Sequence, residues 1–261
     1  MKLLIMFKLK QSFGMKDKPL KILVTGGQGE FAKQLVKHNP DCQILTPSKS
    51  ECDVTSFWYM DRYFYNYQKD YDYVIHAGAI TRPMVIHEEK PMLSVKTNII
   101  GTGNVVLCCE RYNKKLIYLS TDYVYPGQSG DYKETDTLKP FTKYGWSKLG
   151  GECAVQMYPN HLILRLAMNK KPFPHPKALA DMKKSLMWIE DVAKIVPKLL
   201  DKTGIINVGG ESQTVFDFVK KTNPKVEKIY LSDIGDVNMA KDCSMNTQKL
   251  KKVLDDSTIQ H

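Results

Sequence analysis

The most constraining feature of this chain is a glycine-rich turn between a β-rich run and a helical pattern. The run Lys21–Thr25 ends directly in Gly26-Gly27-Gln28-Gly29, and a helical pattern follows over residues 30–38. Glycines let the backbone turn sharply and approach a pyrophosphate, and the amides and dipole of a helix N-terminus favour an anion. The turn therefore predicts a dinucleotide-binding unit in which the following residues line the cofactor: Gly26, Gln28, Gly29, Glu30 and Phe31.

Strand and helix patterns alternate along the chain as far as about residue 168. Besides Lys21–Thr25, strands are expected at 42–46, 71–76, 115–120 and 162–166. The helices between them are expected at 30–38, 56–68, 91–112 and 142–157. This rhythm predicts the α/β class, with a Rossmann-type doubly wound parallel sheet covered on both faces.

The C-terminal third is less regular. Alternating prolines in residues 171–176 exclude a helix there and predict an extended loop over a cleft. Later elements are expected at 189–200, 204–208, 214–221, 226–231 and 246–254. We expect three parts: a basic N-terminal extension over 1–18, an NADP-binding Rossmann domain over 19–168, and a small substrate-binding lobe over 169–261. Segments of the lobe are expected to interleave with the main sheet.

Composition narrows the class of protein and its partners. The chain has 261 residues, 43% of them hydrophobic and 25% charged, as in soluble globular proteins. Its net charge of +10 favours an anionic partner without choosing one. The lysines are scattered, which argues against nucleic acid. No apolar run has the length of a membrane span and no secretory signal is evident, so we expect no membrane partner and a cytoplasmic location. The six cysteines lack Cys-x-x-Cys spacing, so no metal site is expected.

The residues at the end of the second predicted strand indicate which of the two nicotinamide dinucleotides, NAD(H) or NADP(H), the chain would bind. An acid there accepts hydrogen bonds from the ribose hydroxyls, whereas a cation with small hydroxyl residues accommodates a 2′-phosphate. The sequence offers Thr46-Pro47-Ser48-Lys49 and no acid at that point. We therefore expect NADP(H), with Ser48 and Lys49 on the phosphate and Asp53-Val54 near the adenine. An ordinary surface turn has the same composition.

A tyrosine and a lysine four residues apart form the strongest chemical signal. Tyr144 and Lys148 lie on one face of the expected helix. A nearby cation lowers the pKa of a phenol, which can then donate a proton to a carbonyl oxygen as a hydride arrives. Thr121 ends a central strand and can orient that carbonyl. The expected catalytic residues are therefore Thr121, Tyr144 and Lys148.

Four motifs carry a resemblance to a known family: Ala77–Thr81 (AGAIT), Leu119–Gly127 (LSTDYVYPG), Tyr144–Glu152 (YGWSKLGGE) and Asp242–Thr247 (DCSMNT). Together they resemble the extended short-chain dehydrogenase/reductases and, within them, the dTDP-4-dehydrorhamnose reductases. The resemblance runs from about Lys21 to Leu254. It implies NADPH-dependent reduction of the C4 carbonyl of a 4-keto-6-deoxyhexose linked to dTDP or UDP, as in rhamnose-type deoxysugar biosynthesis.

The resemblance also implies roles for individual residues. Lys148 would bind the nicotinamide ribose as well as serve catalysis, and residues along the cofactor would be Ala77, Gly78, Ala79 and Asn98. The implied substrate contacts are Thr81, Arg82, Asp122, Tyr123 and Lys171. The helices at 91–112 and 142–157 are similar to those that form a four-helix dimer interface in this family, which implies a homodimer.

Two alternatives remain open. The compact lobe and Thr81-Arg82-Pro83 are closer to the UDP-rhamnose synthases, which combine 3,5-epimerisation with 4-reduction. Epimerisation needs an acid and a base beside the carbonyl, and the candidates are His87, Lys170, Lys171 and His175. The other alternative is a non-catalytic NADP-binding subunit that resembles the methionine adenosyltransferase regulatory subunit.

Overall fold

A six-stranded parallel sheet forms the centre of the molecule. In this computed structural model, residues 18–235 and 239–259 are described, so nearly all of the expected N-terminal extension (1–18) lies outside them. The strand order is β10-β5-β4-β3-β1-β2, and every neighbouring pair is parallel. The strand bounds are β1 Lys21–Thr25, β2 Gln43–Leu45, β3 Tyr73–His76, β4 Lys115–Thr121, β5 His161–Leu166 and β10 Gly204–Val208.

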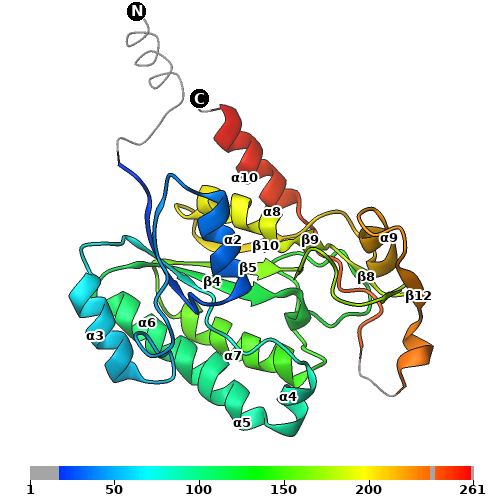
Figure 1. The fold of residues 1–261 in the computed structure, drawn as a ribbon, viewed down its shortest axis with the longest axis horizontal. Helices are drawn as coiled ribbons and strands as arrows, with labels where there is room; N and C mark the ends of the chain where they lie inside the picture. The colour runs from blue at the N-terminus through cyan, green and yellow to red at the C-terminus, as the bar shows by residue number, and fades with distance from the viewer. Residues whose placement is uncertain (1–17, 236–238, 260–261) are drawn as a thin grey trace, which may run out of the picture.

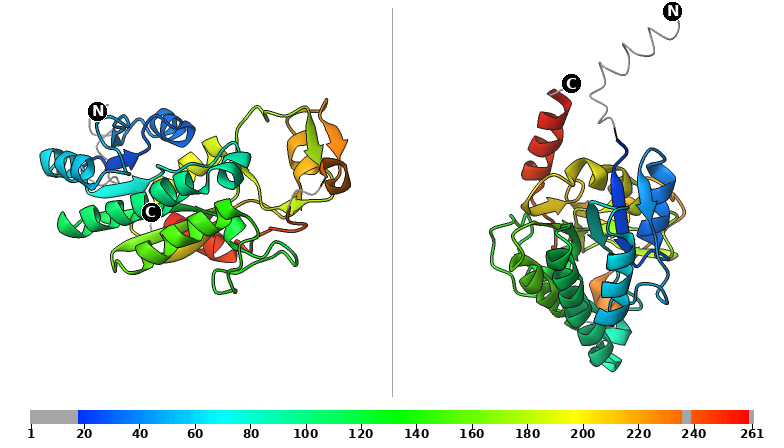
Figure 2. Two further views of the ribbon diagram at one scale, coloured as in Figure 1. Left: turned by 90° about the horizontal axis from the view of Figure 1, so that it is seen from below. Right: turned by 90° about the vertical axis from the view of Figure 1, so that its left-hand side faces the viewer.

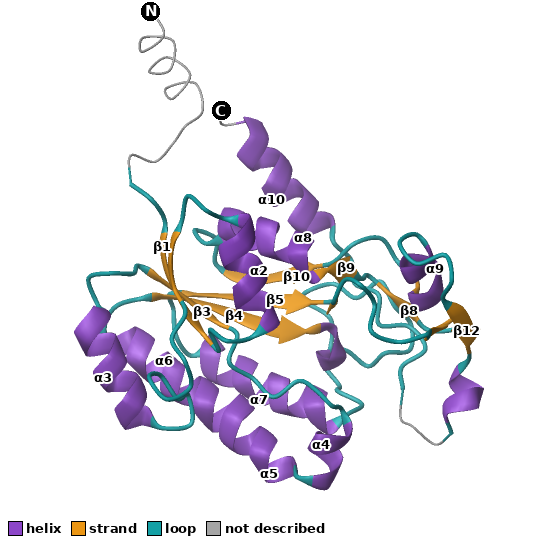
Figure 3. Ribbon diagram, viewed as in Figure 1, coloured by secondary structure: helices purple, strands orange, loops and turns teal. Residues whose placement is uncertain are grey.

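Helices cover both faces of this sheet (Figures 1 and 3). One face carries α2 (Glu30–His38), α8 (Ile189–Ile195), the 3₁₀ turn η3 (Val196–Leu199) and α10 (Gln248–Ile259). The other carries α3 (Phe57–Tyr67), the nearly continuous run α5 (Pro91–Ser94), η1 (Val95–Ile100) and α6 (Gly101–Arg111), and α7 (Lys143–Gln156). Each face buries its own apolar cluster, because alternate strand residues point to opposite sides. The expected doubly wound α/β fold is confirmed.

A third apolar cluster lies beyond the carboxyl ends of the strands, and Figure 2 shows its segments projecting to one side. Short paired strands build it: β6 (Met168–Asn169) with β9 (Met187–Trp188), β7 (Lys177–Leu179) with β12 (Glu227–Ile229), and β8 (Lys183–Lys184) with β11 (Gln213–Thr214). Around them lie η2 (Asp122–Val124), α9 (Val215–Lys220) and η4 (Leu231–Ile234), whereas α4 (Val85–Glu89) lies beside α5 and α7.

The fold differs from the sequence expectation in several local features. The long helix expected at 91–112 contains a π-helical turn, η1, in its middle. Segment Pro91–Arg111 is long and apolar enough to span a membrane by length and composition alone. In this fold its inner side is buried, including Asn98, Thr102 and Val105, and core helices of α/β proteins share this property. The expected strand at 226–231 is shorter, and residues 231–234 form η4 instead.

Parallel strand ends converge at one edge of the sheet. Strand β1 has β2 on one side and β3 on the other, so the chain connections leave in opposite directions at the β1–β3 boundary. Open α/β sheets bind ligands in the crevice outside such a switch point. The loops that follow β1, β3, β4 and β6 therefore frame the candidate site.

Candidate active site

The turn after β1 requires glycine at two positions. Gly26 has φ +71°, and a Cβ on it would lie 2.7 Å from the Cα of Gly78 in the turn after β3. A Cβ on Gly27 would lie 2.4 Å from the carbonyl carbon of Thr46. Gly29 donates its amide to the Gly26 carbonyl and begins α2 without a side-chain cap. The first amides of α2 therefore remain available to an anion, which fits a dinucleotide pyrophosphate.

Glu30 lies at the N-terminus of α2, where a free carboxylate would repel phosphate. Its carboxylate accepts a hydrogen bond from Gln34 and forms an ion pair with Lys170 at 3.2 Å. These contacts lower the pKa of Glu30, with the Gln34 hydrogen bond as the largest cause. Nearby, Arg82 donates to the side-chain oxygen of Asn169. The turns after β1, β3 and β6 therefore meet at this rim.

The segment after β2 contains an acid that the sequence argument missed. Glu51 Oε2 accepts the amide of Ser48 at 2.8 Å and its hydroxyl at 2.7 Å, and Lys49 lies 3.9 Å from Asp53. Val54 lies against the switch point, since a Cβ on Gly78 would be 3.2 Å from its Cγ1. The two expected phosphate ligands therefore already have carboxylate partners. Both contacts join residues three or four positions apart, so the local turn after β2 creates this arrangement.

A buried polar chain fixes the turn after β3. Thr25 Oγ1 and the Nδ1 of His76 are 2.6 Å apart, and His76 Nε2 lies 3.0 Å from Thr102 Oγ1. Burial lowers the pKa of His76 to about 3, so the ring is neutral. Asn98 accepts the amide of Ile80, donates to its carbonyl and donates to Ser147 Oγ. Asn98 thus holds residues 77–80 against α7 and uses its side-chain amide for this purpose.

The three expected catalytic residues meet at the end of β4. Thr121 is the last residue of that strand, and its side chain lies close enough to the phenol of Tyr144 on α7 to lower the pKa of that phenol. Thr142 caps α7 by accepting the amide of Gly145 at 3.0 Å. A Cβ on Gly145 would lie 2.4 Å from the carbonyl oxygen of Tyr123, so glycine allows α7 to begin against η2. This close approach brings the phenol to the strand end.

Lys148 is buried one helical turn beyond Tyr144. Its Nζ lies 4.1 Å from the ring centroid of Tyr118, and the residue is 3% exposed. Burial lowers the pKa of Lys148 from 10.5 to about 7, and Glu152 opposes that change. An ammonium with such a pKa changes its charge in the neutral range, as is common among functional groups.

The electrostatics of Tyr144 differ from the sequence expectation. Lys148 was expected to lower the pKa of the phenol, but burial raises it to about 12. The hydrogen bond to Thr121 and the charge of Lys184 oppose this rise, while Asp122 adds to it. The ring also contacts His87 and Tyr123, at centroid distances of 5.0 and 6.1 Å. The cation that opposes the rise in the pKa of Tyr144 is therefore Lys184 on β8, and the sequence did not indicate this residue.

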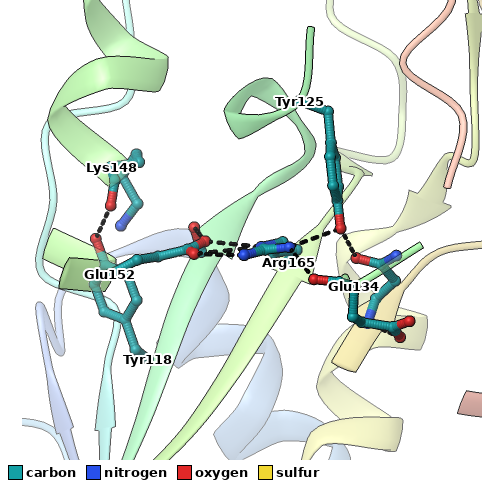
Figure 4. A network of polar contacts seen from close by, with 8 residues as sticks. Tyr118, Tyr125, Glu134, Lys148, Glu152 and Arg165 are labelled. Atoms are coloured by element: carbon teal, nitrogen blue, oxygen red, sulfur yellow. Dashed lines mark hydrogen bonds and ion pairs between the residues drawn. The ribbon is translucent and has the colours of Figure 1, made fainter. Parts of the chain in front are cut away.

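A buried ion-pair network lies behind the trio (Figure 4). Arg165 Nη2 lies 2.9 Å from Glu152 Oε2, with the two side chains 1% and 0% exposed. Ser120 donates to Glu152 Oε1, while Arg165 also donates to the hydroxyl of Tyr125. Tyr118 donates to the backbone carbonyl of Lys148. These contacts join β4, β5 and α7 beneath the site.

The remaining predicted residues lie in different environments. Thr81 is exposed, and Lys171 pairs with Glu190 at 3.5 Å. Asp122 is buried and pairs with Lys184. Of the epimerisation candidates, His87 is buried with Nδ1 on Ser94, Lys170 pairs with Glu30, and His175 contacts Phe173. No acid–base pair forms among these four residues.

The remaining groups with chemical potential are the cysteines and the side chains that could bind a metal. Among the described residues, no group of three or more His, Cys, Asp or Glu side chains is arranged to hold a metal. All six cysteines are free. Burial raises the pKa of the thiols of Cys108 and Cys109, which suits inert packing residues.

The chain thus has a Rossmann-type α/β fold, with a glycine turn at the switch point and a Thr–Tyr–Lys cluster at the carboxyl ends of the strands. Residues 20–169 match the family model described as the RmlD substrate binding domain. That match covers more than half of the chain, and the chain belongs to this family.

Two curated relatives extend the comparison. A dTDP-4-dehydrorhamnose reductase from Aggregatibacter actinomycetemcomitans is 32% identical over 155 residues, which cover 56% of this chain and 50% of that protein. Methionine adenosyltransferase 2 subunit beta from Bos taurus is 28% identical over 144 residues, or 52% of this chain and 42% of that protein. The chain thus spans about half the length of these relatives.

Among solved structures, dTDP-4-dehydrorhamnose reductase from Bacillus anthracis in complex with NADP has a TM-score of 0.79. Its sequence identity is 22%, and the superposition covers 94% of this chain and 100% of that one. At this identity the likeness establishes the fold, which extends over nearly all of the chain.

Proposed function

We propose that this protein catalyses NADPH-dependent reduction of the C4 carbonyl of a nucleoside-diphosphate 4-keto-6-deoxyhexose. The observation that carries the proposal is the cluster of Thr121, Tyr144 and Lys148 at the carboxyl end of β4. Open α/β sheets place reacting groups at that edge, beside the nucleotide crevice. The relative named dTDP-4-dehydrorhamnose reductase supports the same reaction class.

Each residue of the cluster has a distinct part in the proposed reaction. NADPH, when bound, supplies the hydride for C4. Tyr144 remains protonated at neutral pH, because its pKa is about 12, and it donates the proton to the carbonyl oxygen. Thr121 holds that oxygen beside the phenol by a hydrogen bond. Lys148 binds the nicotinamide ribose and supplies a positive charge beneath the site.

The cofactor proposal rests on the turn after β1 and the segment after β2. Uncapped amides at the start of α2 suit the pyrophosphate, and Ser48 and Lys49 are the proposed ligands of the 2′-phosphate. The Bacillus anthracis structure, which shares the fold, is in complex with NADP. NADPH is therefore proposed to bind more tightly than NADH.

We propose that the sugar nucleotide binds between the carboxyl ends of the strands and the C-terminal lobe. Residues 19–168 would bind the cofactor and 169–261 would supply the lobe. The proposed substrate contacts are Thr81, Arg82, Asp122, Tyr123 and Lys171. The nucleotide would be dTDP or UDP, and the protein a cytoplasmic homodimer.

Incubation with dTDP- and UDP-4-keto-6-deoxyglucose and NADPH tests this function. NADPH oxidation is followed by absorbance, and product stereochemistry by NMR. Tyr144→Phe should bind NADPH normally and lose nearly all turnover, because the proton donor is removed. Undiminished reduction by that variant contradicts the mechanism, and absence of turnover by the native protein on every 4-keto sugar tested contradicts the function.

A regulatory subunit is the second candidate, because methionine adenosyltransferase 2 subunit beta from Bos taurus is similar to about half of this chain. That function predicts nucleotide binding without turnover, together with a change in the activity of a partner enzyme. Solvent deuterium at C3 and C5 of the product would instead indicate that the enzyme also epimerises its substrate.

A further inference from the structure

A buried cation from the C-terminal lobe lies beside the catalytic cluster. Lys184 is the inward residue of β8, whereas its neighbour Lys183 is exposed. Lys184 Nζ lies 2.8 Å from Asp122 Oδ2, and the two side chains are 12% and 3% exposed. Strand β8 pairs with β11, and the backbone of Lys183 is hydrogen bonded to Lys241 and Cys243. These contacts fix the position from which the ammonium reaches the site.

The same ammonium contacts the aromatic residues around Tyr144. Lys184 Nζ lies 4.0 Å from the ring centroid of Tyr123, a cation–π distance. Tyr123 in turn packs edge to face against Tyr144. Lys184 is therefore separated from the phenol-bearing ring by a single aromatic layer.

Asp122 links this cation to the hydroxyl of Thr121. Thr121 Oγ1 donates to Asp122 Oδ1 at 3.1 Å, and the side chain of Thr121 also lies beside the phenol of Tyr144, whose pKa it lowers. The contacts form a continuous series from Lys184 through Asp122 and Thr121 to Tyr144. A carboxylate that lacked its cation would be separated from the proton donor by Thr121 alone, and its charge would disfavour the phenolate.

We propose that Lys184 is a positioning residue for the proposed reduction: it neutralises and orients Asp122, so that Thr121 and Tyr144 are held in their reactive arrangement. Lys184 acts through Asp122 and need not touch substrate or cofactor. The inference deepens the proposed function and rests on it for its kinetic test. It also predicts a property of Tyr144 that can be measured without turnover.

Other titratable groups lie around Tyr144 and contribute to the pH dependence of any measurement on it. Lys148 lies on the same helix as Tyr144 and has a pKa of about 7. His87 from α4 and Cys243 beside Lys184 are both neutral, because burial lowers the pKa of the imidazole and raises that of the thiol. At the alkaline pH where Tyr144 titrates, the pair of opposite charges beside it is therefore Asp122 and Lys184.

The kinetic test compares four variants by the pH profile of reduction. In Lys184→Gln the carboxylate loses its cation, so the alkaline limb should move up by about one pH unit. Asp122→Asn keeps the acceptor for Thr121 but removes the negative charge, so the limb should move down. In the double variant Asp122→Asn/Lys184→Gln, the pH of the alkaline limb should return close to the native value, whatever the change in the rate itself. Lys184→Arg should keep it, because the charge is retained.

Lys183→Gln is the matched control, since it removes the same charge from the exposed neighbour on the same strand. Its profile should equal that of the native protein. Two results would overturn the proposal and show that Lys184 is purely structural. One is a rate that falls in Lys184→Gln at every pH while the alkaline limb stays at its native pH. The other is a double variant in which the rate losses of the two single variants add up and the alkaline limb does not return to its native pH.

A second readout separates this inference from the proposed function. With isotope-labelled tyrosine, the NMR signal of Tyr144 is identified by its disappearance in Tyr144→Phe and titrated with pH. The signal should titrate at higher pH in Lys184→Gln and at lower pH in Asp122→Asn than in the native protein. If native protein reduces no 4-keto sugar but these shifts occur, the function fails while the charge arrangement stands. If the signals do not shift, the arrangement itself is refuted.

Discussion

Lys148 shows at the scale of one residue how this site trades stability for reactivity. Its pKa falls from 10.5 to about 7 on burial, so the folded state binds its proton less tightly than the unfolded chain. The cost to stability is greatest below pH 7 and declines as the pH rises toward 10.5. We expect Lys148→Met to lose turnover and to gain roughly 2 kcal/mol at pH 6, or about 4–8 °C in Tm.

Thermal unfolding between pH 6 and 9 measures this effect, and the gain should shrink as the pH rises. Lys143→Met is the control, because Lys143 lies on the same helix and is exposed. A pH-independent gain, or a loss at pH 6, would show that the buried ammonium is not the source of the cost.

Glu51 gives a second prediction at residue scale. Its carboxylate accepts both the amide and the hydroxyl of Ser48, so it competes with a 2′-phosphate for those donors and repels it. Glu51→Gln should therefore tighten NADPH binding several-fold and leave NADH binding nearly unchanged. Fluorescence titration with both dinucleotides measures this, with the exposed Glu89→Gln as control. An equal change for NADH and NADPH would place the 2′-phosphate elsewhere.

The buried network beneath the site acts at the scale of elements, since it ties α7 to β4 and β5. Glu152→Gln would leave the guanidinium of Arg165 buried without its carboxylate, and breaking such a pair costs roughly 3–5 kcal/mol. Chemical denaturation should show this loss, whereas Glu110→Gln on the exposed side of α6 should change stability by less than about 0.5 kcal/mol. Equal stability of the two variants would mean that the ion pair contributes nothing net.

The sequence predicts some of the strands and misses others. Strands β1, β3, β4 and β5 were predictable because each is an apolar run followed by a turn or helix signal. The strands β6 to β9 are only two or three residues long, and they exist because distant segments pair with them. Lys184 was missed for the same reason, because its partner Asp122 is distant in the sequence. Glu51 was missed because the local turn after β2 directs its carboxylate to Ser48, three residues earlier.

Two neighbouring helical segments carry exposed apolar side chains on their outward faces, which bears on how the whole molecule assembles. On η1, α6 and α7, the apolar side chains of Ile100, Leu107, Trp146 and Met157 are 52%, 56%, 54% and 83% exposed. The two helical segments pack against each other, as Figure 1 also shows. Exposed apolar side chains on adjoining helices are typical of a binding interface, and a second copy of the chain is the proposed occupant.

Leu107→Lys/Met157→Lys tests that assembly, because like charges would face each other across a two-fold interface. Light scattering after size exclusion should give a dimer for the native protein and a monomer for this variant, with NADPH affinity retained. Val36→Lys on α2, an exposed apolar residue on the opposite face of the sheet, should remain dimeric. If the native chain is a monomer, the surface does not serve self-association. If the double variant stays dimeric, the copies meet through another surface, and these four side chains are exposed for a different partner.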